Sequence, residues 1–357
     1  MLGDKLDKKV TSRDVARVAG VSQSTVSLVL NNVKEKKIKP ETRAKVLEAA
    51  RKLNYRINVN ARNMKSRKAG SIGLLSSWDA QTFVFPPVIK GVQAVCSEKD
   101  MGVVICTGKP GVGGKKDYID YYLQNRIDGL VYVSYVGVPY EGVIEELASY
   151  NIPFVCVIGA RDLPGVSCVD VSFLESGKMA VNHLAEMGYK NIAYVLYDEI
   201  KNLVYAEKER YEGCLKAALN NGIRLSAVEP FKLPSDEETS IRDITAFLKE
   251  NEYDAVISTS YMCFLFLKAS ARAGINVPDS LGVISLDNDL FAPYLYPSLT
   301  TVDEPLYDIA VKAVNILFEK IEGDTTCHKL ELMPHLTVRE STARKRRKDA
   351  SGSLHKT

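Results

Sequence analysis

The sequence is poor in the residues that build metal and disulfide frameworks. It has only four histidines and seven cysteines in 357 residues, and no two cysteines form a C-x-x-C pair. Such a set supplies neither a zinc framework nor an even number of disulfide partners. Most of the cysteines lie in apolar stretches such as Val155-Cys156-Val157, where a thiol behaves as a small hydrophobic side chain. We therefore expect a reducing compartment, no metal ion and no cofactor.

Long hydrophobic segments are also missing. The longest local apolar run, Tyr261–Leu267, is far shorter than the roughly 20 residues that a membrane-spanning helix needs. The segment Met1–Val10 is charged and lacks the apolar core of a secretory signal. A hydrophobic fraction of 46% nevertheless supplies enough apolar surface for two or three ordinary domains. These features predict a globular, cytoplasmic protein.

The charge is unevenly distributed along the chain. Residues 1–68 hold 18 Lys and Arg against 6 Asp and Glu, a balance of +12. Because the whole chain carries +3 and the last fifteen residues carry +5, the stretch 69–342 carries −14. A compact cationic region attracts a polyanion by releasing its condensed counterions, whereas the acidic middle would repel one. The N-terminal region is therefore the candidate for binding nucleic acid.

The basic region shows the spacing of three short helices. Apolar residues recur three and four positions apart at Val15, Ala16 and Ala19, then at Val26 and Leu30, and last at Val46, Leu47, Ala50 and Leu53. Gly20 allows a tight turn between the first two helices, and Pro40 suits the first position of the third. The first two helices form a helix-turn-helix pattern. From Tyr55 to Gly70 the chain is polar and basic without an apolar face, which indicates a linker or a helix that needs a partner.

Beyond this linker, strand-like runs alternate with helical ones. The first series comprises Ile72–Leu75, Val88–Cys96, Val103–Cys106, Gly129–Val133 and Phe154–Ile158. The pattern restarts with a helix at Ser176–Met187, strands at Ile192–Leu196, Ala255–Ile257 and Val283–Leu286, and a helix at Leu306–Ile321. Such alternation predicts two α/β lobes with parallel sheets. Ligands of such sheets bind beyond the carboxyl ends of the strands, so we expect a binding cleft between the lobes.

The segment Val10-Thr11-Ser12-Arg13-Asp14-Val15-Ala16-Arg17-Val18-Ala19-Gly20-Val21-Ser22-Gln23-Ser24-Thr25-Val26-Ser27 closely resembles the headpiece of the LacI/GalR family of transcriptional regulators. The resemblance continues, less closely, to Arg339-Glu340-Ser341-Thr342. It implies an all-α helix-turn-helix headpiece plus an α/β two-lobed periplasmic-binding-protein-like domain. We divide the chain into the headpiece (1–57), a hinge helix or linker (58–70), a two-lobed effector-binding and dimerisation domain (71–342) and a basic tail (343–357).

The second helix of the headpiece carries the residues expected to read DNA bases. Ser22 can cap this helix, so that Gln23, Ser24 and Thr25 project as hydrogen-bonding groups. The Gln23 amide can pair with adenine in the major groove. Leu28 stands where many relatives carry a polar or basic reader, and an aliphatic side chain can contact a thymine methyl instead. A solvated polar turn is the alternative interpretation of this segment.

Further DNA contacts are implied by the resemblance. Phosphate-binding positions of the family correspond here to Thr11, Asn31, Tyr55, Arg56 and Asn58, although a structural or solvent role is open for each. The hinge segment Asn60-Ala61-Arg62-Asn63-Met64 would place Arg62 in the minor groove and Met64 as an apolar wedge between base pairs. A disordered basic linker is the alternative for this hinge.

The effector-binding residues follow from the same resemblance. Arg210 and Asp287 match family positions that hold an effector, and Phe85 lies near the family's aromatic residues in the first lobe. A guanidinium and a carboxylate can bind the hydroxyl groups of a sugar or an anionic group, and an aromatic ring can stack on a sugar face. Where many relatives carry Asn-Asp, this chain has Thr259-Ser260, which keeps hydroxyls but loses the carboxylate. The alternatives are an Arg210–Asp287 structural ion pair and a core position for Phe85.

Other functions fit the sequence less well. The glycine-rich stretch Lys109–Lys116 fails the spacing of both phosphate-loop motifs, and Cys327, His328 and His335 do not form an ordered ligand set. No local motif supplies catalytic residues, so we do not expect an enzyme. The sequence predicts a homodimeric repressor that binds a pseudo-palindromic DNA operator under the control of a small-molecule effector, expected to be a carbohydrate. The alternative is a sugar-binding receptor without DNA regulation.

Overall fold

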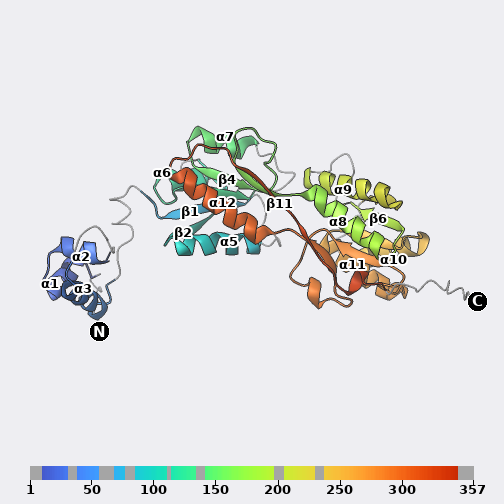
Figure 1. The fold of residues 1–357 in the computed structure, drawn as a ribbon, viewed down its shortest axis with the longest axis horizontal. Coiled ribbons are helices and arrows are strands. Elements are labelled where there is room, and N and C mark those ends of the chain that lie inside the picture. The colour runs from blue at the N-terminus through green and yellow to red at the C-terminus, as the bar shows by residue number, and fades with distance from the viewer. Residues whose placement is uncertain are drawn as a thin grey trace, which may run out of the picture. The chain divides into compact units, whose positions relative to one another are not determined.

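The computed structural model describes residues 10–30, 38–55, 68–76, 85–110, 114–133, 141–196, 205–229 and 237–344. The chain separates into two compact units, Met1–Gly70 and Ser71–Thr357 (Figure 1). Each unit has its own hydrophobic core.

The first unit contains the three expected helices, α1 (Ser12–Ala19), α2 (Gln23–Leu30) and α3 (Pro40–Lys52). Their apolar faces meet in one small core built around Val15, Val26 and Val46, all of which are fully buried. The prediction for Leu47 was wrong, because its side chain is exposed and Ala49 takes the inward position on α3. Leu47 and Ala49 are both apolar and lie within one turn of α3, so spacing alone does not show which of the two side chains faces the core.

The second unit begins with a lobe built on a six-stranded parallel sheet in the order β11-β5-β4-β3-β1-β2. Its strands are β1 (Ser71–Ser76), β2 (Gly102–Cys106), β3 (Leu130–Val133), β4 (Phe154–Val157), β5 (Cys168–Val171) and β11 (Lys329–Leu332). Helices α5 (Phe85–Glu98) and α12 (Leu306–Ile321) pack on one face, and α6 (Asp117–Leu123) and α7 (Glu141–Ser149) pack on the other. Strands covered on both faces explain the nearly continuous Val- and Ile-rich runs of the sequence.

The second lobe repeats this layered plan. Its six-stranded sheet has the order β12-β10-β9-β8-β6-β7. The strands are β6 (Asn191–Val195), β7 (Arg224–Val228), β8 (Ala255–Ser258), β9 (Gly282–Ser285), β10 (Thr300–Asp303) and β12 (His335–Thr337). Helices α8 (Phe173–Glu186) and α9 (Tyr205–Asn221) cover one face, while α10 (Glu237–Glu250) and α11 (Ser260–Ala273) cover the other. The described part of this lobe also contains 3-10 turns at Ala292–Tyr294 and Glu340–Thr342.

The chain passes between the lobes after β5, after β10 and after β11 (Figure 1). The predicted two-lobed α/β architecture is confirmed, with one exception to the parallel sheets. Strand β12 runs antiparallel to β10, because the short link from Leu332 to His335 brings the chain straight from one sheet into the other without a crossover helix. The apolar run at residues 88–96 is one of the helical runs and lies in α5.

Candidate DNA-binding headpiece and effector site

The turn between α1 and α2 has the geometry that Gly20 was expected to allow. Gly20 adopts a left-handed conformation with φ of 65°, and its backbone N–H donates to the carbonyl of Ala16. Only glycine adopts this backbone region at little cost. Val21 then donates to the same carbonyl at 3.1 Å. The turn therefore sets the angle at which α2 leaves α1.

At the start of α2, Ser22 is the predicted helix cap. The backbone N–H of Thr25 donates to Ser22 Oγ at 3.1 Å, and the Ser22 hydroxyl also lies 2.7 Å from Ser24 Oγ and 2.8 Å from Thr25 Oγ1. Ser22, Gln23 and Ser24 are exposed, whereas Thr25 is half-buried. The first turn of α2 thus presents a row of hydroxyl and amide groups to solvent.

Gln23 is held by a residue that sequence reasoning missed. Its Nε2 donates to Ser12 Oγ, on α1, at 2.8 Å. Because Ser12 belongs to the preceding helix, this bond limits the directions that the amide can take before any DNA contact forms. A serine near the start of α1 is common in sequences, so nothing in the sequence marks Ser12 as the hydrogen-bond partner of Gln23. Leu28, further along α2, is half-buried.

The phosphate-contact candidates have mixed structural roles. Thr11 precedes α1, and both its backbone N–H and its hydroxyl donate to the Asp14 carboxylate, at 3.0 and 2.7 Å. Tyr55 is half-buried against the headpiece core. Phosphate binding by these two side chains stays a prediction. Lying outside the described residues are Asn31, Arg56, Asn58, Arg62 and Met64.

In the second unit, Arg210 lies on α9 and forms an ion pair with Glu304. Both side chains are only 4% exposed, and the guanidinium stacks over the Phe173 ring at 4.8 Å. The suggested Arg210–Asp287 ion pair is therefore replaced by a pair with Glu304, which directly follows β10. Burial raises the pKa of Glu304, and the Arg210 charge opposes this rise.

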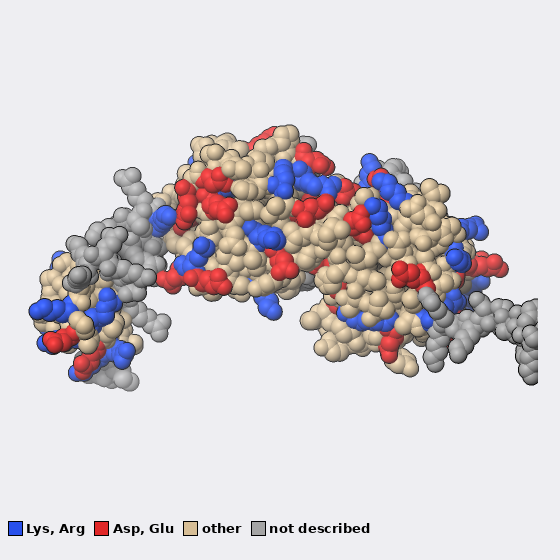
Figure 2. All heavy atoms as spheres, viewed as in Figure 1, with Lys and Arg blue, Asp and Glu red and all other residues tan. Residues whose placement is uncertain are grey.

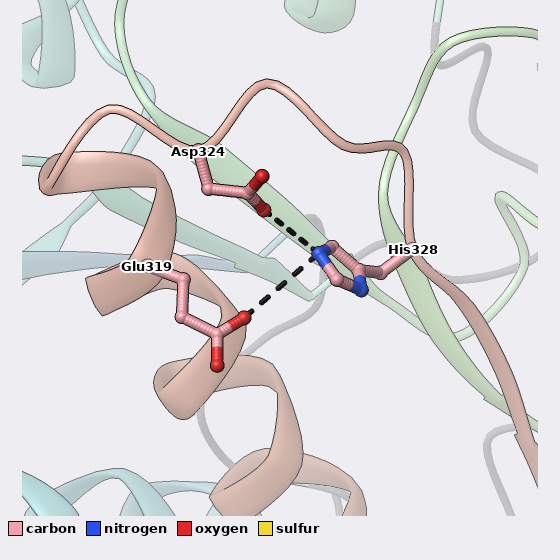
Figure 3. A group of neighbouring side chains, drawn as sticks. All are labelled: Glu319, Asp324 and His328. Carbon is pink, nitrogen blue, oxygen red and sulfur yellow. Dashed lines mark hydrogen bonds and ion pairs between the residues drawn. The ribbon is translucent and has the colours of Figure 1, made fainter.

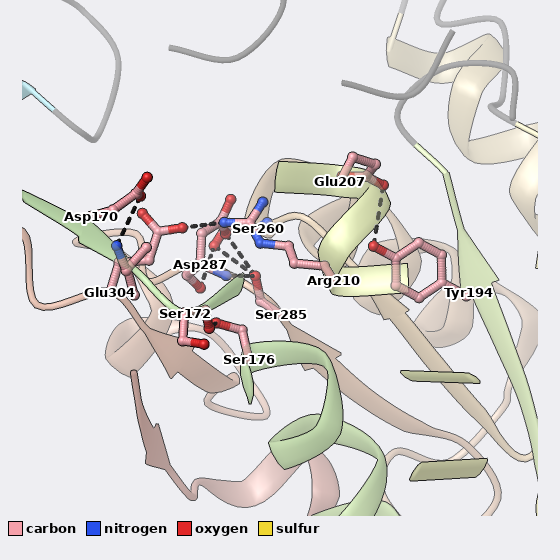
Figure 4. Close-up of polar contacts among 11 residues, drawn as sticks. Asp170, Ser172, Ser176, Tyr194, Glu207, Arg210, Ser260, Ser285, Asp287 and Glu304 are labelled. Carbon is pink, nitrogen blue, oxygen red and sulfur yellow. Dashed lines mark hydrogen bonds and ion pairs between the residues drawn. The ribbon is translucent and has the colours of Figure 1, made fainter. Parts of the chain in front are cut away.

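Asp287 instead holds the start of α11 (Figure 4). Its Oδ1 accepts hydrogen bonds from the backbone N–H of Ser260 and from Ser285 Oγ, both at 2.7 Å. A carboxylate in this place compensates the unpaired N–H groups and the positive end of the helix. Thr259, another effector candidate, is the half-buried residue that precedes α11. The structure thus brings Asp287 and Thr259 together at the carboxyl ends of β8 and β9.

Phe85 begins α5 and is 5% exposed within the core of the first lobe. The core interpretation is therefore the one that this arrangement favours, because stacking on a ligand would require the ring to leave its packing neighbours. No described contact joins Phe85 to Arg210 or Asp287.

Two carboxylates near Arg210 were missed by sequence reasoning. Glu304 is one, and the fully buried Asp170 at the end of β5 is the other (Figure 4). Asp170 accepts backbone hydrogen bonds from Gly159 and Val171, each at 2.9 Å. Burial raises the pKa of Asp170 to about 6 against these hydrogen bonds. Both residues lie at the carboxyl end of a strand, and that position is the signal that could have found them.

A close contact between glycines positions Arg210. A Cβ atom added to Gly177 on α8 would lie 1.9 Å from the carbonyl oxygen of Arg210, and one added to Gly213 on α9 would lie 2.0 Å from that of Leu174. The two helices can approach this closely only without side chains at these positions. The backbone of α9 at Arg210 is therefore set by its packing against α8.

The surface of the second unit carries charges of both signs. On the visible face, Lys and Arg side chains are interspersed with Asp and Glu (Figure 2). An apolar exception lies near α11, where Leu290, Phe291, Tyr294 and Tyr296 are 61–96% exposed. A pocket of about 600 Å³ adjoins them, lined by Tyr261, Phe264, Leu265, Leu295 and Tyr296 among others. Within the described ranges, no helix has the length and apolar character needed to cross a membrane.

Comparisons with known proteins match both units. Residues 11–58 match the model of bacterial regulatory proteins of the lacI family, and residues 181–342 match that of the periplasmic binding protein-like domain. The first of these matches is to the helix-turn-helix part of lacI-family regulators, which the first unit of this chain resembles. The whole chain is 27% identical over 336 residues to catabolite control protein A of Priestia megaterium, covering 93% of this chain and 99% of that protein.

Other similar proteins are regulators as well. The HTH-type transcriptional repressor PurR of Photobacterium profundum is 29% identical over 342 residues, which covers 93% of this chain and 98% of PurR. A structure of the lac repressor dimer bound to operator and an anti-inducer aligns with a TM-score of 0.76 at 23% identity, over 94% of this chain and 99% of that one. The CelR–cellobiose complex aligns with a TM-score of 0.62 at 25% identity, over 93% and 99% of the two chains.

The described residues also include a cluster of potential metal ligands at the end of α12 (Figure 3). His328 Nε2 lies 2.8 Å from Asp324 Oδ2 and 3.8 Å from Glu319 Oε2. Hydrogen bonds from Thr326 and His328 lower the pKa of Asp324. The three side chains are exposed or half-buried. The Asp324–His328 hydrogen bond links the segments that follow α12 and precede β11, and this structural role is sufficient to explain why the three side chains lie together.

Proposed function

We propose that this protein is a transcriptional repressor that binds operator DNA through its headpiece and is controlled by a small molecule bound between its two lobes. The observation that carries the proposal is the first turn of α2, where Ser22 caps the helix and Gln23 and Ser24 are exposed. Helices of this kind enter the major groove with their N-terminal residues against the bases. The +12 balance of residues 1–68 adds the attraction to phosphates.

For the DNA contacts, we assign base reading to Gln23, Ser24, Thr25 and Leu28. Gln23 must exchange its bond to Ser12 for bonds to a base, which makes Ser12 a positioning residue. Phosphate contacts are assigned to Thr11, Asn31, Tyr55, Arg56 and Asn58, and minor-groove contacts to Arg62 and Met64 in the hinge 58–70.

For the effector, we propose a neutral carbohydrate. Arg210 is already paired with Glu304, and Asp170 and Asp287 add two more carboxylates nearby. An anionic ligand would have to displace Glu304 from Arg210 and meet the other acidic groups, whereas hydroxyl groups can both donate to carboxylates and accept from the guanidinium. The CelR complex, which contains cellobiose, is an example of such a ligand in a similar protein.

For the assembly, we propose a homodimer formed through the exposed apolar surface of Leu290, Phe291, Tyr294 and Tyr296. An apolar surface of this kind marks an interface, and a two-fold dimer would pair this patch with itself and fit a pseudo-palindromic operator. The lac repressor structure described above is a dimer on its operator. Replacing Phe291 and Tyr296 together with Asp should convert the protein to a monomer in analytical ultracentrifugation, while Leu219→Asp, at an equally exposed position on α9, should leave the dimer intact.

We further propose that the protein acts in the cytoplasm, without a metal or cofactor and without catalysis. The test of the whole proposal is selection of binding sites from random duplexes, repeated in the presence of neutral sugars, amino sugars and sugar phosphates. The expected result is one pseudo-palindromic sequence whose affinity changes with a neutral sugar. No preference for any duplex over heparin at moderate ionic strength would contradict DNA-binding regulation, and a response confined to sugar phosphates would contradict the effector assignment.

A further inference from the structure

A single arginine connects the two lobes electrostatically. Arg161 lies in the segment that follows β4 of the first lobe, and its guanidinium donates to Glu331 on β11 and to Glu209 on α9. Glu331 belongs to the sheet of the first lobe, whereas α9 packs on the sheet of the second. Arg161 therefore holds one carboxylate of its own lobe and one of the opposite lobe.

Apolar packing surrounds this contact. The first turn of α9 packs against the first lobe: Ala206 is fully buried in the core of that lobe, and Tyr205 contacts the same core. The Arg161 guanidinium lies 5.4 Å from the centre of the Tyr205 ring, which in turn meets Phe173 edge-on at 6.1 Å. The side chains of Arg161 and Glu209 are 30% and 19% exposed. The pair is thus partly shielded from water, and this shielding strengthens it relative to an ion pair on the open surface.

Arg161 keeps a counter-charge when its contact with Glu209 opens. Breaking a buried ion pair is expensive when it leaves one charge without compensation. Here Glu331, which is 37% exposed, stays beside Arg161 when Glu209 moves away with the second lobe. Glu209 moves with α9; its side chain is 19% exposed, and its Oε2 is already buried without a hydrogen-bond partner in the present arrangement. The contact can therefore open without leaving Arg161 uncompensated, and it is less buried than the Arg210–Glu304 pair, in which both side chains are 4% exposed.

We propose that Arg161 and Glu209 form a reversible clasp that stabilises the present arrangement of the two lobes and so biases the equilibrium on which effector control depends. The link to regulation rests on the function proposed above, but the clasp itself is a statement about lobe geometry. A contact made in only one of two arrangements shifts their populations by the free energy of that contact.

The test measures the distance between the lobes directly. In the full-length protein with the exposed Cys327 replaced by Ser, spin labels are attached at Glu98→Cys, at the end of α5, and at Lys249→Cys, on α10. Both positions are exposed, one on each lobe. Double electron–electron resonance spectroscopy then gives the distribution of distances between the two spin labels. It is measured for four proteins: the labelled parent, Arg161→Met, Glu209→Gln and the double variant.

The clasp predicts that each single variant broadens the distribution or shifts it to a new mean, and that the double variant does no more than either single one, because both remove the same contact. Arg272→Met is the matched control, since Arg272 pairs with Glu238 within the second lobe, and it should reproduce the parent distribution. Parent-like distributions in either single variant, additive effects, or an equal shift in the control would each overturn the clasp. Should Arg161→Met fail to fold, the isosteric Glu209→Gln decides the question alone.

Operator binding is a separate readout. If the proposed function is right, Arg161→Met and Glu209→Gln should change operator affinity in the same direction by about fivefold or more. If the parent binds no duplex, the proposed function fails while the distance measurement still decides the clasp. If the distances change but operator affinity does not, the clasp holds the lobes without serving regulation, and the regulatory part of the proposal is overturned.

Discussion

The headpiece and the two-lobed unit organise their functional residues in opposite ways. In the headpiece, the candidate base readers lie within one helix, from Gln23 to Leu28, and their cap is the preceding residue. In the two-lobed unit, Arg210 meets Glu304 across 94 positions of sequence, and Asp287 reaches back to the start of α11. Local sites can be identified from a short motif, whereas distributed ones depend on how sheets and helices assemble.

The two regions should differ most in what a single substitution does to stability. Replacing Arg210 with Met leaves the buried Glu304 without its counter-charge, and removing one member of such a pair typically costs about 3–5 kcal/mol. Denaturant unfolding of the full chain measures the loss. The double variant Arg210→Met with Glu304→Leu should recover most of it, because both buried charges are then gone. A loss below about 1 kcal/mol for Arg210→Met would mean that water reaches this pair.

Asp170 should make the stability of the two-lobed unit fall as the pH rises, whereas Glu48 in the headpiece has a pKa lowered by Lys52, an effect of the opposite sign. The folded-state pKa of Asp170, about 6, lies above its ordinary value of 3.8, so the folded protein retains a proton that the unfolded chain releases between these values. The resulting stability is complete below pH 3.8 and is lost as the pH rises through about 6. The difference amounts to about 3 kcal/mol at most. Comparing unfolding of the parent and of Asp170→Asn from pH 4 to 7 isolates it, and identical slopes would contradict the assignment.

Substitution of Gln23 tests base reading by the headpiece. Replacing it with Ala should weaken discrimination at one base pair of the operator by about 1–3 kcal/mol and leave nonspecific binding nearly unchanged. Competition binding with operator variants and random duplexes separates the two effects. Ser12→Ala serves as a graded control, because it frees the Gln23 amide without removing it. Equal losses on all duplexes would mean that Gln23 contacts the phosphate backbone.

The smallest expected effect concerns the cap of α2. Ser22→Ala removes the acceptor for the Thr25 N–H and should destabilise the headpiece by about 1 kcal/mol. Thermal unfolding followed by helical circular dichroism measures this change. Ser27→Ala, at an exposed position in the same helix, provides the comparison. If Ser22→Ala is no less stable than Ser27→Ala, the hydroxyl cap contributes nothing to the headpiece.

Much of the architecture could be predicted because its signals are local. The capped starts of helices, the glycine turn and the Val-rich strands each depend on residues within one or two turns, and α12 has the predicted bounds Leu306–Ile321. Errors arose where neighbouring positions compete, as with Leu47 and Ala49 on α3, and where a strand direction depends on a distant link, as with β12. Neither choice is encoded by spacing alone.

Less of the candidate effector site could be predicted from the sequence. The resemblance supplied Arg210 and Asp287, but the partner of Arg210 turned out to be Glu304, and Phe85 lies in the core of the first lobe. Which carboxylate neutralises a guanidinium depends on which strand ends meet, and this follows from sheet order rather than from sequence distance.

By itself, the sequence determined the cationic helical headpiece, the alternation that produces two α/β lobes and the resemblance to the LacI/GalR family. Only the tertiary structure decided that Arg210 is neutralised by Glu304, that Gly177 and Gly213 set its position, and that Arg161 reaches across the lobes. The physical reason is the range of each interaction. Helix caps, turns and burial patterns depend on residues that are close in the sequence. The raised pKa of Asp170 and the buried ion pairs instead require segments far apart in the sequence to come together and exclude water.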